Sequence, residues 1–376
     1  MNITTFYRKP SILSILSIIL LLSGCAGEQH DKKSPSAVIE GTRLRTDALM
    51  GREFICISGN SLIMRSFYPD TVAVIYDIAG DSLKRDGSFG IKGRGPFEFT
   101  YPSFYLRQDS LYMLDASLSG ELPKIVCAAV EDLRNGSGYE KWKEYDLQWI
   151  GSMLLGMSFA PAGGQDFILI GEEFGKENLL NVINISERTV RGMNYWIDDN
   201  YTGPVIPKQS IYTGNADIFI NGDRLLYASG EGRYLEILRL GKDFKLSHET
   251  SIYSIPPVYE ATPDGLNFKP LETSYRGIDA YTTDRFIYIS LNPYNPEYKP
   301  YKGYPWYCAD EIEVYDWDGN FAGCFATDIP FYDFVVTPDD GTLYTLTEDP
   351  GSGEPAIYKT ALPISRPVRD KVPLGL

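Results

Sequence analysis

Residues 284–288 read Asp284-Arg285-Phe286-Ile287-Tyr288, a polar turn pair that leads into a short apolar, β-favouring run. The same pattern recurs along the whole chain. Its other copies are Asn60-Ser61-Leu62-Ile63, Asp109-Ser110-Leu111-Tyr112, Gln165-Asp166-Phe167-Ile168, Asp223-Arg224-Leu225-Leu226-Tyr227 and Asp340-Gly341-Thr342-Leu343-Tyr344. A turn followed by such a run is typical of a strand that begins at a tight turn. Its repetition indicates an architecture built from copies of one unit.

The copies follow one another at a nearly constant period. One marker from each copy gives the series Ile63, Met113, Leu169, Tyr227, Tyr288 and Tyr344. The successive spacings are 50, 56, 58, 61 and 56 residues, and six such units use nearly all of the chain after residue 36. This period is too long for the strands of a sandwich.

Each unit also holds an apolar run before the marker and two after it. In the fifth unit, Ile312-Glu313-Val314-Tyr315 faces Phe321-Ala322-Gly323-Cys324-Phe325 across Asp318-Gly319, and Asp-Gly between such runs is a strong hairpin signal. Four short antiparallel strands per unit, repeated six times, predict an all-β fold, a six-bladed β-propeller. Helical periodicity is scarce; the stretch 125–133 has some, but its neighbours favour a strand.

The last unit is one strand short. After Tyr344 only residues 356–360 form another good strand, so the outermost strand of the last blade is missing. An open ring would leave unpaired sheet edges. We therefore expect the N-terminal segment 37–44 to supply the missing strand and close the last blade.

Composition narrows the function classes. The formal net charge is −15, whereas a nucleic-acid-binding surface would be basic. The chain has 35 Gly, 24 Pro and 27 Tyr, a turn-rich composition that argues against a helical bundle. Its two His leave little room for a zinc site or His-based catalysis.

The N-terminus reads as a targeting segment. Arg8 and Lys9 precede an apolar run over 11–22, which as a helix spans about 18 Å, too short for a bilayer core of about 30 Å. This is the size of the apolar part of a signal peptide. The next residues, Leu22-Ser23-Gly24-Cys25, resemble the bacterial lipobox, and this implies lipidation of Cys25 after cleavage.

The expected domains are therefore a lipoprotein signal peptide over 1–24, a flexible tether over 25–36 and the propeller over 37–376. The tether is small and polar, as flexible linkers are. Ala26 stands where an Asp would signal retention in the inner membrane, so we expect a lipid anchor in the outer membrane. The periplasm and the cell surface both stay open, and the lipid is the expected membrane contact.

Four further cysteines, Cys56, Cys127, Cys308 and Cys324, show no C-x-x-C spacing that would indicate a redox or metal site. A hairpin turning at Asp318-Gly319 does not place Cys308 opposite Cys324. We expect free, buried thiols.

A glycine-rich stretch follows the first unit, Gly90-Ile91-Lys92-Gly93-Arg94-Gly95-Pro96-Phe97-Glu98-Phe99. It resembles the G-x-G-P-x-E-F signature of the six-bladed, TolB-like propeller lipoproteins of Bacteroidetes. That resemblance implies a propeller in the cell envelope and no settled activity. The matching residues are Gly93, Gly95, Pro96, Glu98 and Phe99. Phe97 replaces a common Gly, so we expect a less tight turn there.

Two readings of this loop stay open. Gly93 and Gly95 tolerate positive φ, and Pro96 fixes its own φ, as a structural connector requires. In that reading Glu98 accepts backbone N–H bonds. In the other reading Glu98 is the polar group of a ligand-contacting loop.

No catalytic residue is predicted. There is no G-x-S-x-G motif, His30 lies in the tether and His248 lies in a polar strand-like run. No metal site or cofactor is predicted either, although calcium stays open because propeller channels can gather carboxylates. The available aspartates, which are otherwise turn residues, are Asp310, Asp316, Asp318, Asp339 and Asp340.

The most suggestive surface segment is 291–308, which holds four Pro, five Tyr and one Trp and interrupts the fifth unit between its second and third strands. Tyr and Trp offer flat apolar faces with a polar edge, suited to sugars, peptides or proteins. The candidate ligand-binding residues are Tyr294, Tyr298, Tyr301, Tyr304, Trp306 and Tyr307. Segments 195–212 and 255–275 are similar. Alternatively, these insertions pack on each other and cover one end of the ring.

The leading hypothesis is a lipid-anchored binding or scaffold propeller for a glycan, a peptide or an envelope protein. The rival is a propeller hydrolase or lyase that uses carboxylates of the central channel, with or without calcium. Three or more acids converging in the channel with few basic neighbours would favour the rival. A channel plugged by apolar residues would count against it.

Overall fold

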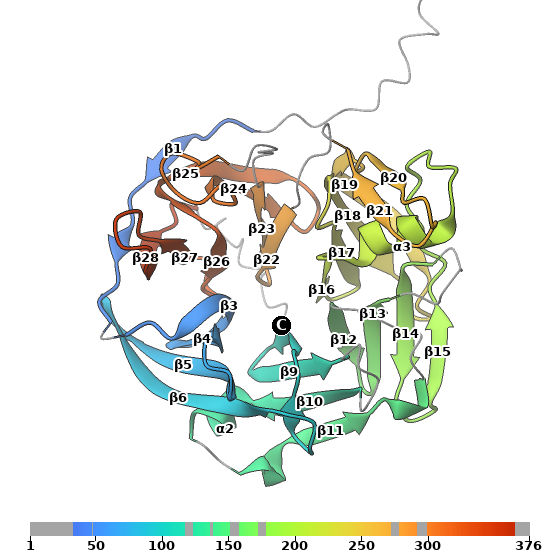
Figure 1. Cartoon of the computed structure of the whole chain (residues 1–376), viewed down its shortest axis with the longest axis horizontal. Helices are drawn as coiled ribbons and strands as arrows, with labels where there is room; N and C mark the ends of the chain where they lie inside the picture. The colour runs from blue at the N-terminus through green and yellow to red at the C-terminus, as the bar shows by residue number, and fades with distance from the viewer. Residues whose placement is uncertain are drawn as a thin grey trace, which may run out of the picture. The chain divides into compact units, whose positions relative to one another are not determined.

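The computed structural model describes residues 33–46, 48–116, 123–135, 138–150, 158–171, 178–271, 278–291 and 299–364. Within these ranges six sheets, each with four antiparallel strands and two of them with a parallel fifth strand, are arranged as the blades of a ring (Figure 1). The all-β, six-bladed propeller is confirmed.

The first three blades follow one another along the chain. Blade 1 holds β3 (Gly51–Ser58), β4 (Ser61–Ser66), β5 (Thr71–Ala79) and β6 (Ser82–Lys92), with β7 (Glu98–Phe99) parallel to β6. Blade 2 holds β8 (Ser103–Arg107), β9 (Ser110–Asp115), β10 (Lys124–Ala129) and β11 (Lys143–Asp146). Blade 3 holds β12 (Phe159–Gly163), β13 (Asp166–Ile170), β14 (Leu180–Asn184) and β15 (Thr189–Gly192).

The other three blades complete the ring. Blade 4 holds β16 (Asp217–Asn221), β17 (Arg224–Ala228), β18 (Arg233–Leu240) and β19 (Leu246–Ile255). Blade 5 holds β22 (Ile278–Thr282), β23 (Phe286–Leu291), β24 (Ala309–Asp316) and β25 (Phe321–Phe331). Blade 6 holds β26 (Asp333–Val336), β27 (Thr342–Glu348) and β28 (Pro355–Ala361). A separate hairpin pairs β20 (Tyr259–Ala261) with β21 (Phe268–Pro270).

The six sequence markers all lie on the second strand of a blade, namely β4, β9, β13, β17, β23 and β27. These strands are buried on both faces because each blade packs between two neighbours. All six residues of β4 and all six of β23 are buried. The outer strand β15 is mostly exposed. A strand buried on both faces reads as an apolar run rather than an alternation, which is why the repeat was visible.

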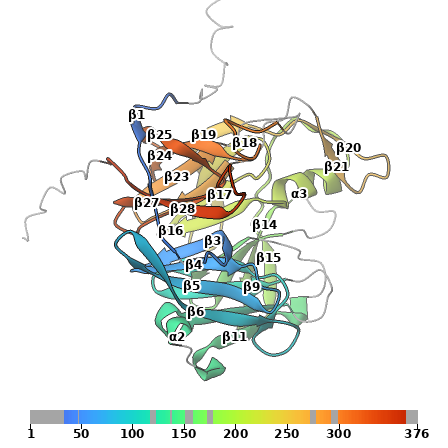
Figure 2. The ribbon, with the colours of Figure 1, turned by 60° about the vertical axis from the view of Figure 1, so that its left-hand side comes forward.

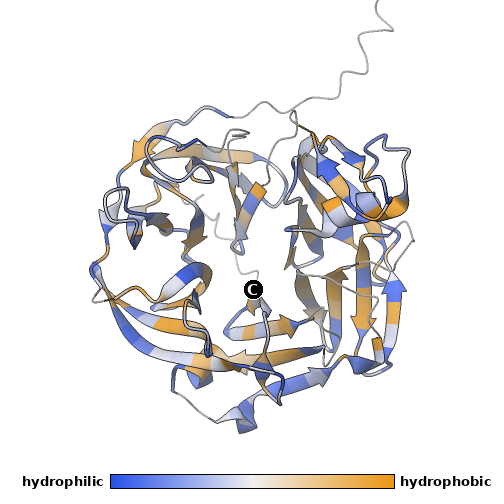
Figure 3. Ribbon diagram, viewed as in Figure 1, coloured by the Kyte–Doolittle hydropathy of each residue, from blue (hydrophilic) through white to orange (hydrophobic). Residues whose placement is uncertain are grey.

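The apolar cores lie between blades. Among the described residues, each of six clusters of buried side chains joins two consecutive blades. The cluster of Leu62, Met64, Val335 and Leu346 joins blade 1 to blade 6 and so completes the ring. In Figure 3 the hydrophobic colour follows strands such as β13 and β14, and β11 is largely hydrophilic.

An N-terminal strand closes the last blade, as expected. Strand β2 (Thr42–Arg43) pairs antiparallel with β28. The expected closing segment 37–44 is too long, however, because β1 (Ala37–Ile39) pairs in parallel with β25 of blade 5. Figures 1 and 2 both show β1 beside β25. The arm that precedes β2 therefore ties two blades together.

Helices are few. They are α2 (Val130–Arg134), α3 (Val205–Thr213) and the 3-10 turns Tyr139–Lys141 and Gln148–Ile150. The strand expected over 125–133 is correct only up to Ala129, since α2 follows and buries Val130 and Leu133 in the core between blades 1 and 2. Across the described ranges, no helix has the length and apolar character needed to cross a membrane.

Candidate functional site

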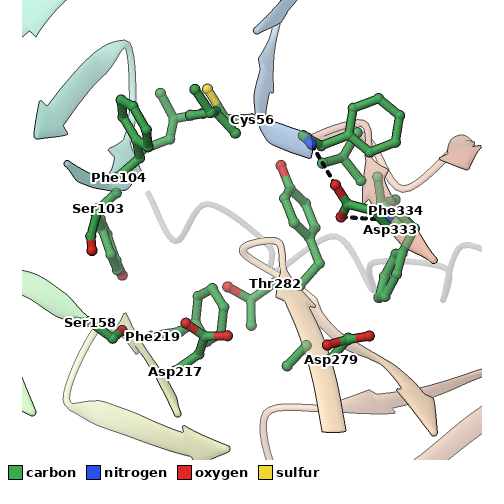
Figure 4. A pocket seen from close by; sticks show the side chains of 18 of the residues that line it. Cys56, Ser103, Phe104, Ser158, Asp217, Phe219, Asp279, Thr282, Asp333 and Phe334 are labelled. Atoms are coloured by element: carbon green, nitrogen blue, oxygen red, sulfur yellow. Dashed lines mark hydrogen bonds between the residues drawn. The ribbon is translucent and has the colours of Figure 1, made fainter. Parts of the chain in front are cut away.

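The six innermost strands, β3, β8, β12, β16, β22 and β26, surround a cavity of about 1330 Å³. Every blade contributes to its lining, so the cavity is the central channel of the propeller (Figure 4). Its volume exceeds the range of about 300–1,000 Å³ that is usual for small-molecule pockets. Among the described residues, the lining leaves this space open and includes both polar and apolar side chains.

Each blade contributes an acidic or hydroxyl residue to the channel lining at or near the start of its innermost strand, and blade 1 also contributes Arg52. The six residues are Glu53, Ser103, Ser158, Asp217, Asp279 and Asp333. Side chains two apart on a strand point to the same side, so Asp217 and Phe219 of β16 both lie in the lining. We call the end of the channel that carries these six residues the mouth. Blades 2 and 3 supply hydroxyls, and the other four supply carboxylates.

Aromatic side chains line the channel beyond the mouth. Phe104, Phe219 and Tyr281 come from β8, β16 and β22. Figure 4 shows Phe104 and Phe219 around the same space as Asp217, Asp279 and Asp333. The channel thus combines hydrogen-bond acceptors with flat apolar faces.

Two mouth carboxyls hold their protons more tightly than usual. Burial, the charge of Asp279 and that of Glu53 raise the pKa of Asp217 to about 7, against a hydrogen bond from Ser158. Burial raises the pKa of Asp333 well above its usual range, and the charges of Glu53 and Asp279 act in the same direction. Asp333 also accepts the backbone N–H of Phe54 at 2.5 Å and its carboxylate meets the N–H of Phe334 at 2.8 Å, which oppose the shift.

Arg65, one of the arginines in the lining, has partners other than these two carboxyls. Arg65 donates its Nε–H to Glu53 at 2.9 Å and an Nη1–H to the carbonyl of Pro102 at 2.9 Å. Its guanidinium lies 4.3 Å from the ring centroid of Tyr101 and 5.0 Å from that of Phe104. The partners found for Asp217 and Asp333, a hydroxyl and two amides, are neutral.

The arrangement has two chemical capacities. Ionised carboxylates accept hydrogen bonds from hydroxyl, amide and ammonium groups. A carboxyl with a pKa near 7 beside an ionised one also suits general acid–base catalysis. The convergence of Glu53, Asp217, Asp279 and Asp333 meets the condition that favours the enzymatic rival, and Arg52, Arg65 and Arg107 in the same lining weaken it.

The aspartates considered for calcium have protein partners. The set is Asp310, Asp316, Asp318, Asp339 and Asp340. Asp316 accepts the N–H of Asp318 at 2.9 Å and that of Asn320 at 2.8 Å, as a turn residue does. In the described part of the chain, no group of three or more His, Cys, Asp or Glu is arranged to hold a metal ion.

The tyrosine-rich insertion lies against blades 5 and 6. Tyr301 donates its hydroxyl to Asp310 at 2.8 Å, and Tyr307 donates to Glu348 at 3.0 Å. None of Tyr301, Tyr304, Trp306 and Tyr307 lines the channel, although the ring of Tyr307 meets that of Tyr332, which does, at 5.7 Å. The other two candidates, Tyr294 and Tyr298, lie outside the described residues.

The other two insertions pack on each other. Segment 195–212 includes most of α3, and segment 255–275 includes the β20–β21 hairpin, which Figures 1 and 2 both show beside α3. The rings of Tyr201 and Tyr259 stack at 4.6 Å. Buried Asp199 contacts the ammonium of Lys208 at 2.7 Å and accepts the hydroxyl of Tyr259 at 2.9 Å.

The glycine-rich loop has the contacts of a structural connector. Glu98 accepts the backbone N–H of Gly95 at 2.8 Å, and a Cβ on Gly93 would lie 2.1 Å from the Glu98 carboxylate. Phe97 adopts φ = 56°, so the left-handed turn is kept although the residue is not Gly. Gly93, Gly95, Pro96, Glu98 and Phe99 are all absent from the channel lining.

His248 has a superficial likeness to a catalytic histidine. Its Nε2 lies 3.0 Å from the hydroxyl of Ser251 and 3.4 Å from a carboxylate oxygen of Glu236. Both contacts fall on the same nitrogen, whereas a triad needs the acid on the other one. The His248 side chain is also exposed.

The four cysteines within the described ranges are free. Cys324 pairs with Glu313 across the β24–β25 hairpin, so Cys308 does not face it. Cys56 lines the channel, but burial raises the pKa of its thiol to about 12, which keeps it protonated. Cys127 is only partly buried.

Sequence reasoning missed the mouth residues. With 50 acidic residues, no carboxylate was singled out by number alone. The usable signal was a polar residue next to apolar residues at the start of each unit, as in Glu53-Phe54-Ile55, Asp217-Ile218-Phe219 and Asp333-Phe334-Val335.

No family model matches this chain, and no curated protein does. Among solved structures, a member of the DUF4221 family from Bacteroides vulgatus is 11% identical over 89% of this chain and 99% of its own, with a TM-score of 0.52. The match to a protein of unknown function from Bacteroides thetaiotaomicron covers 88% of this chain and 75% of that protein's chain, at 9% identity and a TM-score of 0.44. The match to TolB from Acinetobacter baumannii covers 82% of this chain and 66% of the TolB chain, at 14% identity and a TM-score of 0.39. The first likeness supports the propeller fold and extends to no activity.

Proposed function

We propose that this chain is a binding module whose ligand enters the central channel at the mouth. The observation that carries the proposal is the gathering of Glu53, Asp217, Asp279 and Asp333 in one cavity of about 1330 Å³ with aromatic walls. Carboxylates recognise the donors of a ligand, and rings such as Phe219 contact its apolar faces. The size of the cavity suits part of a glycan or of a peptide, including a segment of an envelope protein.

A thermal melt tests this proposal. The full-length chain in detergent is heated with panels of oligosaccharides and peptides, with and without calcium and EDTA. A ligand at 100 times its dissociation constant stabilises the fold by about 2.7 kcal/mol, which shifts the melt by a few degrees. We expect Asp279→Asn to remove the shift.

The matched control is Glu187→Gln, which removes an exposed carboxylate next to β15 on the outer edge of blade 3. It should keep the full shift. A shift that survives Asp279→Asn would place the ligand elsewhere, and Trp306→Ala would then test the tyrosine-rich insertion.

A second candidate, a hydrolase or lyase, is favoured by one observation. The pKa of Asp217, about 7, lets it hold a proton for a leaving group at neutral pH, and burial followed by the charges of the nearby carboxylates raises that pKa. Turnover of any glycan in the panel that Asp217→Asn abolishes while binding persists would establish catalysis. A binding module leaves every ligand intact after prolonged incubation.

We also propose that the propeller is held at the outer membrane by a lipid on Cys25. The support is the Leu22-Ser23-Gly24-Cys25 sequence after a short apolar run. Several acyl chains anchor a protein firmly, whereas one holds it only marginally. Labelled palmitate should enter the wild-type chain and not Cys25→Ala, and the variant should leave the membrane fraction.

A further inference from the structure

The mouth of the channel is chemically one-sided. Glu53, Asp217, Asp279 and Asp333 come from four blades that are consecutive around the closed ring, blades 4, 5, 6 and 1. The serines of blades 2 and 3 occupy the rest of the circle. A ligand group at the mouth therefore faces carboxylates over most of its circumference.

Two of the three arginines in the lining, Arg65 and Arg107, have partners other than Asp217 and Asp333. Arg65 is fixed by Glu53, by Pro102 and between two aromatic rings. Arg107 donates to the carbonyl of Pro161 at 2.9 Å and lies at the other end of its strand, away from Ser103. The partners found for Asp217 and Asp333, a hydroxyl and two amides, are neutral, so none of these partners would offset the negative charge that forms when either carboxyl loses its proton.

Aromatic rings stand beside these carboxylates. Phe219 lies two residues along β16 from Asp217, and Tyr281 lies two residues along β22 from Asp279. Residues two apart on a strand share a face, so each ring lies on the same side of its strand as its carboxylate. Rings next to carboxylates attract cations through the ring quadrupole as well as through charge.

On the basis of the proposed channel binding, we propose that the mouth takes an ammonium or guanidinium group of the ligand. That group would sit between Asp217, Asp279 and Asp333, with its apolar stem against Phe219 and Tyr281. The net charge of −15 would draw such a ligand to the channel and would speed its association. A lysine or arginine side chain and a free polyamine both carry this chemistry.

Calorimetric titrations of the full-length chain in detergent at low salt test the inference. The probes are the peptide GSKSGSKSG, its Nε-acetylated form, spermidine, and the neutral sugar maltohexaose. We expect the lysine peptide to bind at least tenfold more tightly than its acetylated form. Asp217→Asn should weaken it at least fivefold, and Glu187→Gln should not. Spermidine binding as tightly as the peptide would identify a polyamine as the source.

Proton linkage gives a second readout. The groups that act on Asp217 are Asp279 from β22, the Ser158 hydroxyl before β12 and Glu53 from β3. The same cavity is lined by Asp333 and by the arginines Arg52, Arg65 and Arg107. Asp217 is half protonated near neutral pH, and a cation favours its ionised form, so lysine-peptide affinity should rise between pH 6 and pH 8. A neutral sugar should show no such rise.

The outcomes separate this inference from the proposed function. Two outcomes would overturn the cation inference: equal affinity for the lysine peptide and its acetylated form, or tighter binding of maltohexaose than of the lysine peptide. If Asp217→Asn still weakens that binding, the proposal that ligands bind in the channel stands. If neither Asp217→Asn nor Phe219→Ala changes the affinity for the probes, the cation inference and the proposed channel binding are both overturned. Absence of any lysine-peptide or spermidine binding at millimolar concentration would also overturn the cation inference.

Discussion

Asp217 makes the stability of the folded chain depend on pH. Its pKa is about 7 in the fold against 3.8 for an ordinary aspartate, so the folded state binds more protons than the unfolded state between those values. By linkage, the stability present below about pH 4 is lost as the pH rises through 7. Asp217→Asn, which is neutral throughout, should therefore be more stable than wild type at pH 8.

We expect this gain to exceed about 1 kcal/mol at pH 8, or roughly 2 °C in the melting temperature, and to shrink towards pH 4.5. Differential scanning calorimetry at both pH values measures it. Glu187→Gln should show no pH-dependent gain. An equal effect of Asp217→Asn at both pH values would mean that the Asp217 carboxyl titrates normally.

At Phe97, backbone strain and side-chain packing have opposite effects on the stability of the fold. A left-handed φ at a residue with a side chain costs about 1–2 kcal/mol. Its ring stacks on Tyr139 at 5.4 Å and meets Trp142 edge-on at 6.0 Å, and burial plus ring contact contributes about 2–3 kcal/mol. Packing therefore outweighs strain, and this is why the turn survives without Gly.

The resulting prediction is an order of stability. Phe97→Gly loses the ring and relieves the strain, so we expect a loss of about 1 kcal/mol. Phe97→Ala loses the ring and keeps the strain, so it should be about 1 kcal/mol worse than Phe97→Gly. Urea unfolding measures both variants. A Gly variant more stable than wild type would show that strain dominates.

At the scale of elements, a buried ion pair joins α3 to the loop before it and, through Tyr259, to the β20–β21 hairpin. The side chains of Asp199 and Lys208 are 1% and 7% exposed. Lys208→Met leaves a buried carboxylate without its cation, which typically costs 3–5 kcal/mol. We expect that loss in urea unfolding, with faster proteolysis of segment 195–212.

Two matched variants check this assignment. Lys245→Met breaks the exposed pair with Asp243 and should change stability by less than about 1 kcal/mol. The double variant Asp199→Asn with Lys208→Met should recover most of the loss. No recovery would mean that Lys208 acts through packing, for example against Trp196, whose ring lies 4.9 Å from its ammonium.

Of the two strand pairings made by the N-terminal arm, the sequence pattern predicted one and not the other. The missing strand of blade 6 was predictable because a four-strand count exposes a gap. The parallel pairing of β1 with β25 was not, because three residues carry no periodicity and the pairing depends on where the edge of blade 5 lies. The backbone N–H of Lys33 also donates to buried Glu313 at 3.0 Å, a contact that no local pattern encodes.

The six-bladed ring was predictable from the sequence, but the residues that meet at its centre were not. The second strand of each blade is buried on both faces, so it appears in the sequence as an apolar run. The regular spacing of these runs gives the period of the repeat. The mouth residues converge only because six units close on one another. No property of Asp217 or Asp333 alone marks either as part of a shared site.

The placement of the cores implies that the ring unfolds as one unit. Every cluster of buried apolar residues in the described ranges joins two blades, so no blade has a core of its own. Loss of one interface exposes the apolar faces of two neighbours. We therefore expect a single cooperative transition, in contrast to stacked repeats that unfold in stages.

Removal of β2 is the sharpest test of that cooperativity. A chain beginning at residue 44 loses the pairing of Thr42 and Arg43 with β28, which closes blade 6, and also the pairing of β1 with β25 of blade 5. If the ring is one unit, hydrogen exchange should speed up equally in β27 of blade 6 and in β13 of blade 3, on the opposite side of the ring. Gly41→Pro, which blocks the N–H bond to Asp328 but leaves β2 in place, is the milder control. Faster exchange confined to blade 6 would show that the blades open one at a time and that closure stabilises only its own blade.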